Sequence, residues 1–530
     1  MFQVLTVILL PLSAGFFSFH STAQELNFFP VLSTFIAAPM IAVLLVLMAP
    51  DKYARWITLL ISSFVLGLGL KLFFSYQTAV GGFQFVEDVP WVNNLGINYN
   101  LGINYSLGVD GMGTLMVLSV AIAYFAGALV SWNVSLRKKE YFILFSLLAV
   151  GIFGAYESLN LFFFFLFYEF SILPMYLLVG IWGTGERKEY AAMKMTIYLL
   201  AGSVFMFVGF LAVYFASNVH TFDIRTLSDL SATGLSLGFQ NVWFLFVGFG
   251  VLSALFPIHT WSPDGYGSAP TAASMLHAGV LKNLGGYSLL RIALPLMPDG
   301  AKHWLPYLAI LALFNMLYMA IVALKQTNFK HVIAYSSISH CGAILFGICT
   351  LEVTGLNGAV IQLFSHGIIA AITFALVGLV CEKAHTSELS KLGGFAACMP
   401  VLAGLFMAVA MANVGLPGLS GFVGEFLVFL GSYQSGFHGG FTIYQILFPI
   451  GILSIVLTAV YYLRLLQMVF FEKIKNPQFK EEVKDGSFIE ILPIAVLLIV
   501  SLIIGLYPKP FVDMSNLTIT PLIGHIGGFK

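Results

Sequence analysis

The sequence predicts an all-α polytopic membrane protein, and three observations support this fold class. Of its 530 residues, 59% are hydrophobic and only 9% are charged, whereas about a quarter are charged in a soluble globular domain. The mean hydropathy is +0.94. Apolar stretches of about 20 residues recur along the chain, and each is long enough to cross the ~30 Å hydrocarbon core as a helix.

About fourteen spans can be drawn from these stretches. We expect them near residues 29–49, 55–76, 113–134, 141–157, 160–182, 190–217, 241–259, 270–297, 304–325, 329–349, 355–382, 398–433, 443–471 and 488–507. The seventh span runs into Pro257–Pro263 and the twelfth is interrupted by Val414–Gly421, so both are predicted to be broken helices. Transporters use such breaks at ion sites.

Loop charge predicts the orientation of the spans. Most basic residues fall on alternate loops, which the positive-inside rule places in the cytoplasm. Both ends of the fourteen-span core then face outward. The residues concerned are Lys52, Arg55, Arg137, Lys138, Lys139, Arg187, Lys188, Lys325, Lys330, Lys383, Lys391, Lys473, Lys475, Lys480 and Lys484.

The first 24 residues have two interpretations. Their apolar run and the small residues that follow resemble a signal peptide, yet no Lys or Arg precedes the run. An additional helix is the alternative, and both remain open. The repeat at 95–105 is interpreted as a local duplication in an outer loop.

Composition also bounds partners and metal chemistry. The formal net charge is zero and there is no basic tail, so we expect no nucleic-acid partner. Cys341, Cys349, Cys381 and Cys398 lie in or beside apolar segments without a CxxC or Cys/His ligand set. We expect buried thiols and no disulfide, metal or iron–sulfur site.

Ionisable residues inside the apolar segments are the strongest functional signal. Glu169 lies within 161–182, which contains no basic residue, and Lys194, Lys282, His366 and Glu425 lie in later apolar segments. Charges inside a membrane are costly and usually functional. The sequence therefore predicts a line of titratable groups of the kind that a proton or cation path requires. No nucleotide-binding loop in a soluble strand–turn–helix context accompanies them.

Three motifs, Phe167–Gly183, His331–Gly342 and Gly415–Phe426, closely resemble the antiporter-like subunits of respiratory complex I. Further segments are similar to its subunit M family: 108–111, 384–394, 457–471 and 506–511. The resemblance covers about residues 29–512. It implies fourteen helices with two inverted five-helix repeats, helices 4–8 and 9–13, each containing one broken helix. The implied divisions are 1–28 (signal-peptide-like segment or extra helix), 29–140, 141–300 (first repeat), 301–475 (second repeat) and 476–530.

The resemblance assigns roles to three of the ionisable residues. Glu169 matches the family's essential glutamate on helix 5, and Glu425 matches the glutamate on helix 12 near the outward exit. His366 matches the helix-11 histidine of the central polar axis, whose ordinary pKa suits a relay. A packing group held by a hydrogen bond is the structural alternative for each.

Three weaker candidates join them. His340 is interpreted either as a relay group or as a hydrogen bond between helices. Lys194 is expected to act in the path or to extend to the cytoplasmic surface. His277 is an additional titratable group near the first break.

The sequence departs from the family pattern at two lysines. Counting back from Pro257, the helix-7 lysine position is Leu252, so the usual partner of Glu169 is missing. The helix-8 lysine position is Asn283, one residue after Lys282, a shift of about 100° around a helix.

The loop 261–270 departs as well, because Gly265, Tyr266, Gly267 and Ser268 replace the family's acid and histidine. The group that balances Glu169 therefore remains open among Lys282, Lys194 and His277. We favour Lys282.

The resemblance implies a proton-translocating, M-like subunit of a complex I-type NADH:quinone oxidoreductase in the cell inner membrane. The chain itself is expected to carry no redox site and no cofactor, with NADH, FMN, iron–sulfur clusters and quinone bound elsewhere. Expected partners are the L, N and K type membrane subunits and the lipid bilayer. Two alternatives stay open: a subunit of a multisubunit cation/proton antiporter or membrane-bound hydrogenase, and a structural paralogue with a weakened proton path.

Overall fold

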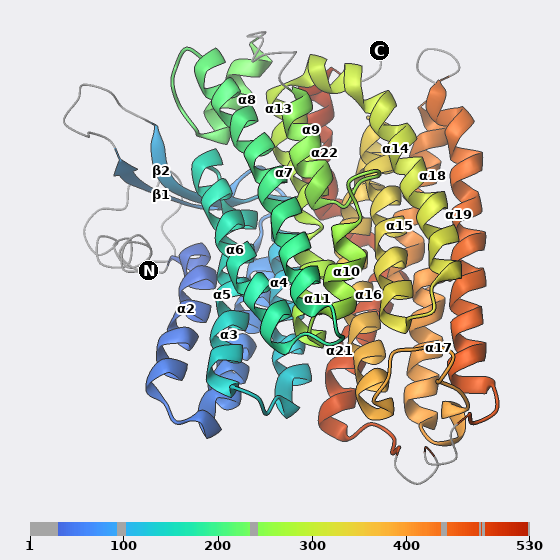
Figure 1. Ribbon diagram of the computed structural model, residues 1–530. Helices are drawn as coiled ribbons and strands as arrows, with labels where there is room; N and C mark the ends of the chain where they lie inside the picture. Colours follow the sequence, from blue (N-terminus) through green and yellow to red (C-terminus); the bar gives the residue numbers. More distant parts are fainter. Residues whose placement is uncertain are drawn as a thin grey trace.

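The computed structural model describes residues 30–92, 102–233, 242–435, 442–475, 479 and 483–527. Long helices run side by side through most of the molecule, and a small two-stranded sheet lies at one flank (Figure 1). The N-terminal segment 1–28 and most of the repeat at 95–105, about which the sequence makes predictions, lie outside the described residues.

The described part of the chain contains 11 helices that are long and apolar enough to cross a membrane. Six belong to its first half: α2 (Val31–Met48), α3 (Ala54–Ser75), α4 (Gly111–Val130), α5 (Lys138–Glu157), α6 (Leu161–Trp182) and α7 (Lys188–Ala216). Five belong to its second half: α14 (Pro298–Lys325), α15 (Phe329–Cys349), α16 (Val353–Ala384), α19 (Ile443–Leu465, continued by the π segment Leu466–Phe471) and α21 (Phe488–Leu506).

The remaining α-helices complete the described chain. They are α8 (Ile224–Ala232), α9 (Val242–Leu252), α10 (Trp261–Ser268), α11 (Thr271–Leu276), α12 (Leu284–Ser288), α13 (Leu294–Leu296), α17 (Pro400–Val414), α18 (Ser420–Gln434) and α22 (Lys509–Ile526). Short 3₁₀ segments occupy Asp51–Tyr53, Ser131–Asn133 and Phe395–Ala397.

Both apolar stretches in which we predict a break are divided in the structure. The first is split between α9 and α10, where residues 253–260 include Pro257. The second is split between α17 and α18, where Gly415 ends α17 at φ +81° and Ser420 begins α18. A left-handed φ favours glycine, so the sequence stops the helix there by a local backbone rule.

Two predictions about the fold are wrong in detail. The chain is not purely helical, because β1 (Gln84–Val92) pairs antiparallel with β2 (Ile103–Val109), from Gln84↔Val109 to Val92↔Ile103. Polar and apolar residues alternate along β2, which is the sequence signal of a strand.

The segment 270–297 is not one helix, since the π segments His277–Leu281 and Leu289–Ala293 interrupt it. Beyond the last predicted span, Lys509–Ile526 forms a further helix, α22, with a partly apolar face packed against α16 and α4.

Helix α16 lies at the centre of this packing. It contacts α4, α11, α15, α18, α21 and α22, and 94% of its apolar window is buried. By contrast, α3, α19 and α21 are only 28% buried in their windows, as expected for helices that face lipid. A polar side chain within this apolar window of α16 is therefore shielded from solvent, and any charge there needs a partner nearby.

A buried ion pair joins α4, the π segment Leu289–Ala293 and α22. Asp110 caps α4 by accepting a hydrogen bond from Gly113 N at 2.8 Å, and it forms an ion pair with Arg291. Thr518 Oγ1 on α22 donates to Asp110 Oδ2 at 2.7 Å. The side chains of Arg291 and Asp110 are only 9% and 6% exposed, so each charge depends on the other.

We expect Asp110→Asn to lower the free energy of unfolding by about 3–5 kcal/mol, because it leaves the Arg291 charge buried and uncompensated. Thermal denaturation of the purified protein measures the change. Glu140→Gln is the matched control, since Glu140 pairs with Arg137 where their side chains are 48% and 53% exposed, and it should cost less than about 1 kcal/mol. Equal effects of the two variants would contradict the structural role of the buried pair.

Candidate functional site

A hydrogen-bonded chain of buried polar groups crosses the centre of the molecule. Lys282 Nζ donates to Ser337 Oγ on α15 at 2.5 Å, and Ser337 Oγ lies 3.0 Å from His366 Nε2 on α16. On its other side His366 Nδ1 lies 3.1 Å from Asn283 Oδ1. Lys282 is 0% exposed and His366 is 3% exposed. The structure thus brings together two of the predicted site residues through a shared serine.

A π segment sets the direction of Lys282. The amide of Lys282 donates to His277 O at 2.9 Å, which is the i→i−5 bond of a π turn. One extra residue in a turn rotates the next side chains by about 100° relative to an α-helix. Lys282 and Asn283 consequently both reach the His366 network, so the one-residue displacement inferred from the sequence does not remove the lysine from the central axis.

A second pair of groups lies beyond His366. His340 Nδ1 on α15 is 3.1 Å from Glu425 Oε1 on α18, and the rings of His340 and His366 are 6.1 Å apart. Glu425 is 7% exposed and His340 is 8% exposed. His340, a weaker candidate from sequence, therefore lies between His366 and the predicted exit glutamate.

Backbone geometry at the second break makes room for the Glu425 carboxylate. A Cβ atom on Gly415 would come within 2.9 Å of Glu425 Oε2, and the φ of +81° at Gly415 disfavours other residues as well. The break between α17 and α18 thus lets the chain pass directly beside the carboxylate.

Glu169 is separate from this central chain. It lies on α6 beside the hydroxyl of Ser203 on α7, and its Oε1 is buried without a hydrogen-bond partner. The hydrogen bonds and ion pairs of the described residues do not join Glu169 to Lys282, whose ammonium binds Ser337 instead. The pairing of Glu169 with Lys282 that we favoured from sequence is not observed. Leu252, at the missing lysine position, is a fully buried apolar residue.

Lys194 has a different partner from those considered in the sequence analysis. Its Nζ lies 2.7 Å from Asp264 Oδ2 on α10, and His331 Nε2 lies 3.8 Å from Asp264 Oδ1. Lys194 is therefore held inside the fold rather than extended freely to the surface. Asp264 is not among the residues predicted from sequence, although a lone acid beside a predicted helix break is a recognisable signal.

Tyr266 connects His277 with Lys282. The Tyr266 hydroxyl lies 2.9 Å from His277 Nδ1, and Lys282 Nζ lies 5.5 Å from the centre of the Tyr266 ring. His277 Nε2 is buried without a hydrogen-bond partner. The residue that departs from the family's loop pattern thus supplies a cation–π contact and a hydroxyl at this position.

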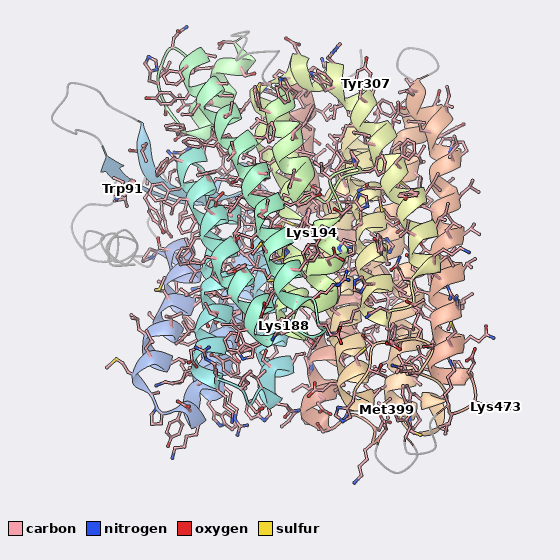
Figure 2. The ribbon with its side chains drawn as sticks, in the orientation of Figure 1. Trp91, Lys188, Lys194, Tyr307, Met399 and Lys473 are labelled. Carbon is pink, nitrogen blue, oxygen red and sulfur yellow. The ribbon has the colours of Figure 1, made fainter. Side chains whose placement is uncertain are left out.

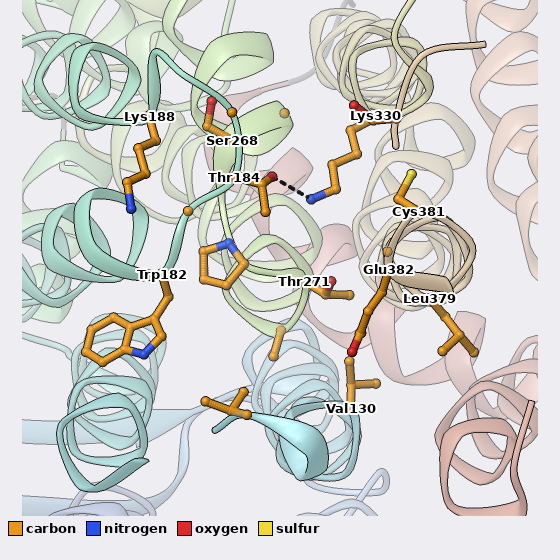
Figure 3. A pocket seen from close by; sticks show the side chains of 18 of the residues that line it. Val130, Trp182, Thr184, Lys188, Ser268, Thr271, Lys330, Leu379, Cys381 and Glu382 are labelled. Atoms are coloured by element: carbon orange, nitrogen blue, oxygen red, sulfur yellow. Dashed lines mark hydrogen bonds between the residues drawn. The ribbon is translucent and has the colours of Figure 1, made fainter. Parts of the chain in front are cut away.

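A cavity of about 1400 Å³ opens beside the loops that carry most of the basic residues and that we predict to be cytoplasmic, here called the lysine-rich loops. Asp264 and His331 line it, together with Lys188, Lys330 and Glu382. Figure 3 shows the ammonium of Lys330 directed at Thr184, and the two atoms are 3.1 Å apart. Lys188 lies toward the lysine-rich end of the bundle and Lys194 nearer its middle (Figure 2). The cavity therefore gives water a route to the Asp264 carboxylate.

Within the described residues no group of three or more His, Cys, Asp or Glu side chains is placed to hold a metal ion. Cys341, Cys349 and Cys381 are buried free thiols, as expected, and Cys398 is half-buried. The site offers a set of groups that accept and donate protons, contributed by α15, α16, α18 and the segment between α11 and α12.

Residues 158–451 match the family model described as "NADH:quinone oxidoreductase/Mrp antiporter, TM". This range contains every ionisable residue of the site, from Glu169 to Glu425. The chain is 36% identical over 504 residues to NAD(P)H-quinone oxidoreductase chain 4 1 of Synechococcus elongatus, covering 94% of this chain and 92% of that protein. It is 34% identical over 505 residues to NADH-quinone oxidoreductase subunit M of Rickettsia prowazekii, covering 93% and 99%.

A solved structure gives the same result for the fold. A chain of respiratory complex I from Thermus thermophilus with bound NADH superposes with a TM-score of 0.83. The two chains are 27% identical, and the match covers 94% of this chain and 100% of that one.

We expect Gly415→Ala to destabilise the protein by about 1–2 kcal/mol, the cost of a left-handed non-glycine residue, and to displace the Glu425 carboxylate. Gly404→Ala is the matched control, because Gly404 lies inside α17 with nothing within 4 Å of its added Cβ. That control should be neutral or stabilising by up to about 1 kcal/mol. Thermal denaturation of both variants checks the difference, and a neutral Gly415→Ala would refute the close approach.

Proposed function

The chain belongs to the NADH:quinone oxidoreductase/Mrp antiporter family, and on that premise we propose that it is an M-like membrane subunit of a complex I-type NADH:quinone oxidoreductase that moves protons outward. The observation that carries the proposal is the buried chain from Lys282 through Ser337 and His366 to His340 and Glu425. Sequence similarity over nearly the whole chain supports the assignment to this enzyme class.

Each member of the chain performs a step that its chemistry allows. The Lys282 ammonium holds a proton at the centre of the membrane, and the Ser337 hydroxyl relays it by accepting one proton and giving up another. The proton then moves by way of the ring nitrogens from His366 to His340, whose ring centres are 6.1 Å apart. Glu425 accepts the proton and releases it toward the outer face.

Uptake begins on the side of the lysine-rich loops. Water in the cavity reaches Asp264, which pairs with Lys194, and the proton continues by way of Tyr266 and His277 toward Lys282. A change in the charge of Asp264 or Lys194 alters the electrostatic potential felt by the next group. This coupling lets one protonation event favour the next.

Glu169 acts as a charge sensor in this proposal. It has an unpartnered carboxylate oxygen and only a serine hydroxyl beside it, so its protonation responds to charges on neighbouring elements and subunits. The missing lysine at Leu252 makes this response depend on more distant groups than in the family pattern.

The finer architecture is part of the same proposal. Fourteen spans result when the eleven long helices are combined with the interrupted stretches α9–α10, α11–α13 and α17–α18. Residues 141–300 and 301–475 form two inverted repeats, flanked by 29–140 and 476–530, with 1–28 as a leader or an additional helix. The two breaks occupy equivalent places in the repeats.

The chain carries no redox site of its own in this proposal, and NADH, FMN, iron–sulfur clusters and quinone are bound by other subunits. Its partners are the L, N and K type membrane subunits, and its location is the cell inner membrane. Co-purification of the intact complex with identified subunits tests these assignments.

An Mrp-type cation/proton antiporter subunit is the second candidate function, and the family description itself includes it. The 34–36% identity to quinone oxidoreductase subunits favours the first. A structural paralogue with weakened transport is the third candidate, and the apolar Leu252 is the observation that favours it. Sodium-dependent proton movement without NADH oxidation would favour the antiporter.

We expect Glu169→Gln and Glu425→Gln each to reduce proton pumping by the reconstituted complex about tenfold or more, a factor that corresponds to about 1.4 kcal/mol. The neutral amide keeps the shape of the side chain but cannot bind or release the proton. Glu388→Gln is the control, because its carboxylate is 54% exposed and forms a local ion pair with Lys391. Unchanged pumping in both test variants would leave only the structural paralogue.

We expect Ser337→Ala to slow proton pumping about tenfold or more while NADH-binding subunits remain attached, because it removes the hydroxyl that bridges Lys282 and His366. Ser339→Ala is the matched control on the same helix, since Ser339 Oγ donates to Met316 O at 2.7 Å and takes no part in the chain. Proton flux measured with a pH-sensitive dye in proteoliposomes distinguishes them. Equal rates in the two variants would exclude the serine relay.

A further inference from the structure

Glu157, the last residue of α5, is a carboxylate that the proposed path does not use. It is 0% exposed, and neither of its carboxylate oxygens has a hydrogen-bond partner. An ionised carboxylate in such a place loses its hydration without any compensation, which costs several kcal/mol in general. A neutral, protonated carboxyl group avoids this cost.

A second buried carboxylate, Glu87, lies close by on β1: it pairs with Leu107 of β2, and Leu107 in turn bridges to Ser158, the residue after Glu157. The negative charge of Glu87 acts on Glu157, and Glu87 is only 6% exposed. Unlike Glu157, it has three donors at the beginning of α2: Leu32 N at 2.8 Å, Ser33 N at 3.0 Å and Ser33 Oγ at 2.5 Å. Burial raises the pKa of Glu87, while these three donors oppose the increase.

The groups around the two carboxylates are mostly neutral. Tyr105 on β2 is 3.1 Å from Ser33 Oγ and lies beside both Glu87 and Glu157. Tyr287 on α12 also faces Glu157. Arg291, which hydrogen-bonds the Tyr287 hydroxyl, forms an ion pair with Asp110. The ion pairs of the described residues give neither carboxylate a cationic partner.

We propose that Glu157 and Glu87 form a proton-binding site in which two buried carboxyl groups hold one proton, carried by Glu157. Two carboxylates that share a buried site cannot both be ionised at low cost, so one of them keeps a proton. The three donors stabilise the charge on Glu87, and the proton therefore stays on Glu157, which has none. The bound proton comes from water on the side of the membrane opposite the lysine-rich loops.

The donors at Glu87 also identify the ligand as a proton rather than a metal cation. Two N–H groups and one hydroxyl direct their hydrogens at the Glu87 oxygens. Those hydrogens occupy the lone pairs that a cation needs and repel it, which leaves Glu157 alone as an anionic ligand. Alkali and alkaline-earth cations require more oxygen ligands than this.

The site joins three elements that are distant in sequence. Glu87 connects β1 to the start of α2, and Glu157 is the last residue of α5. Loss of the shared proton therefore places two negative charges where these three elements meet. The contact between the β1–β2 hairpin, α2 and α5 should then loosen. This site is independent of the chain from Lys282 to Glu425.

Infrared difference spectroscopy on the purified intact complex tests the proton directly. We expect the carbonyl-stretch band of a protonated carboxylic acid in the wild type, shifted by H/D exchange, and loss of that band in Glu157→Gln. Glu388→Gln, at an exposed ion pair, should leave the band unchanged. Glu157→Met provides a second uncharged variant if the glutamine variant fails to assemble. A band that persists in every Glu157 variant, or that disappears when sodium is added at constant pH, would overturn the proposal.

Hydrogen exchange gives a second readout that does not depend on transport. In the folded site Glu157 keeps its proton, whereas a solvated Glu157 in the opened state loses it at any pH above the ordinary pKa of glutamate. Opening therefore becomes easier as the pH rises. We expect exchange at the Leu32 and Ser33 amides, corrected for the intrinsic rate, to increase by up to about tenfold per pH unit in the wild type. Glu157→Gln should abolish this dependence. A pH-independent wild type would refute the shared proton.

Discussion

The cost of placing a charge in a dry, apolar interior is the constraint on which the rest of this structure depends. Each buried cation of the described chain meets a group that offsets the cost. Arg291 pairs with Asp110, Lys282 donates to Ser337 beside an aromatic ring, and Lys330 donates to Thr184. The partly exposed Lys194 pairs with Asp264. These partners come from different helices, so satisfying the charges also fixes how the helices pack.

Helix distortions provide the geometry that these partners need. The π segment before Lys282 directs both Lys282 and Asn283 at the His366 network. The left-handed Gly415 lets the chain pass beside Glu425. A regular helix presents one face to its neighbour, whereas a π turn or a break adds side chains from a second face. The irregular backbone therefore lies where α16 and its neighbours bury it, as a membrane requires.

The sequence predicted the helical membrane fold, both divided stretches and the residues Lys282, His366 and Glu425, because each produces a local signal. A charge in an apolar run or a glycine–proline cluster is visible without knowledge of the fold. The hairpin β1–β2 was missed, because its alternation is short and its pairing is non-local. The Lys194–Asp264 pair was missed for a similar reason: a long lysine on one helix has many partners within reach, and only the packing selects one.

The missing lysine at Leu252 follows from the same electrostatic constraint. A lysine at this fully buried position would need a carboxylate close by, and Glu169 has no cationic partner among the described residues. An apolar Leu252 avoids the desolvation cost of a lysine at this position. The cost of the Glu169 charge is avoided as well only if Glu169 is neutral for much of the time. The ionisation of Glu169 is then a transient event, and the negative charge is not permanent. In a chain where Lys282 is already held by Ser337, such an event can bias the proton relay without forming a direct ion pair, because low-dielectric surroundings carry the electrostatic effect further than water does.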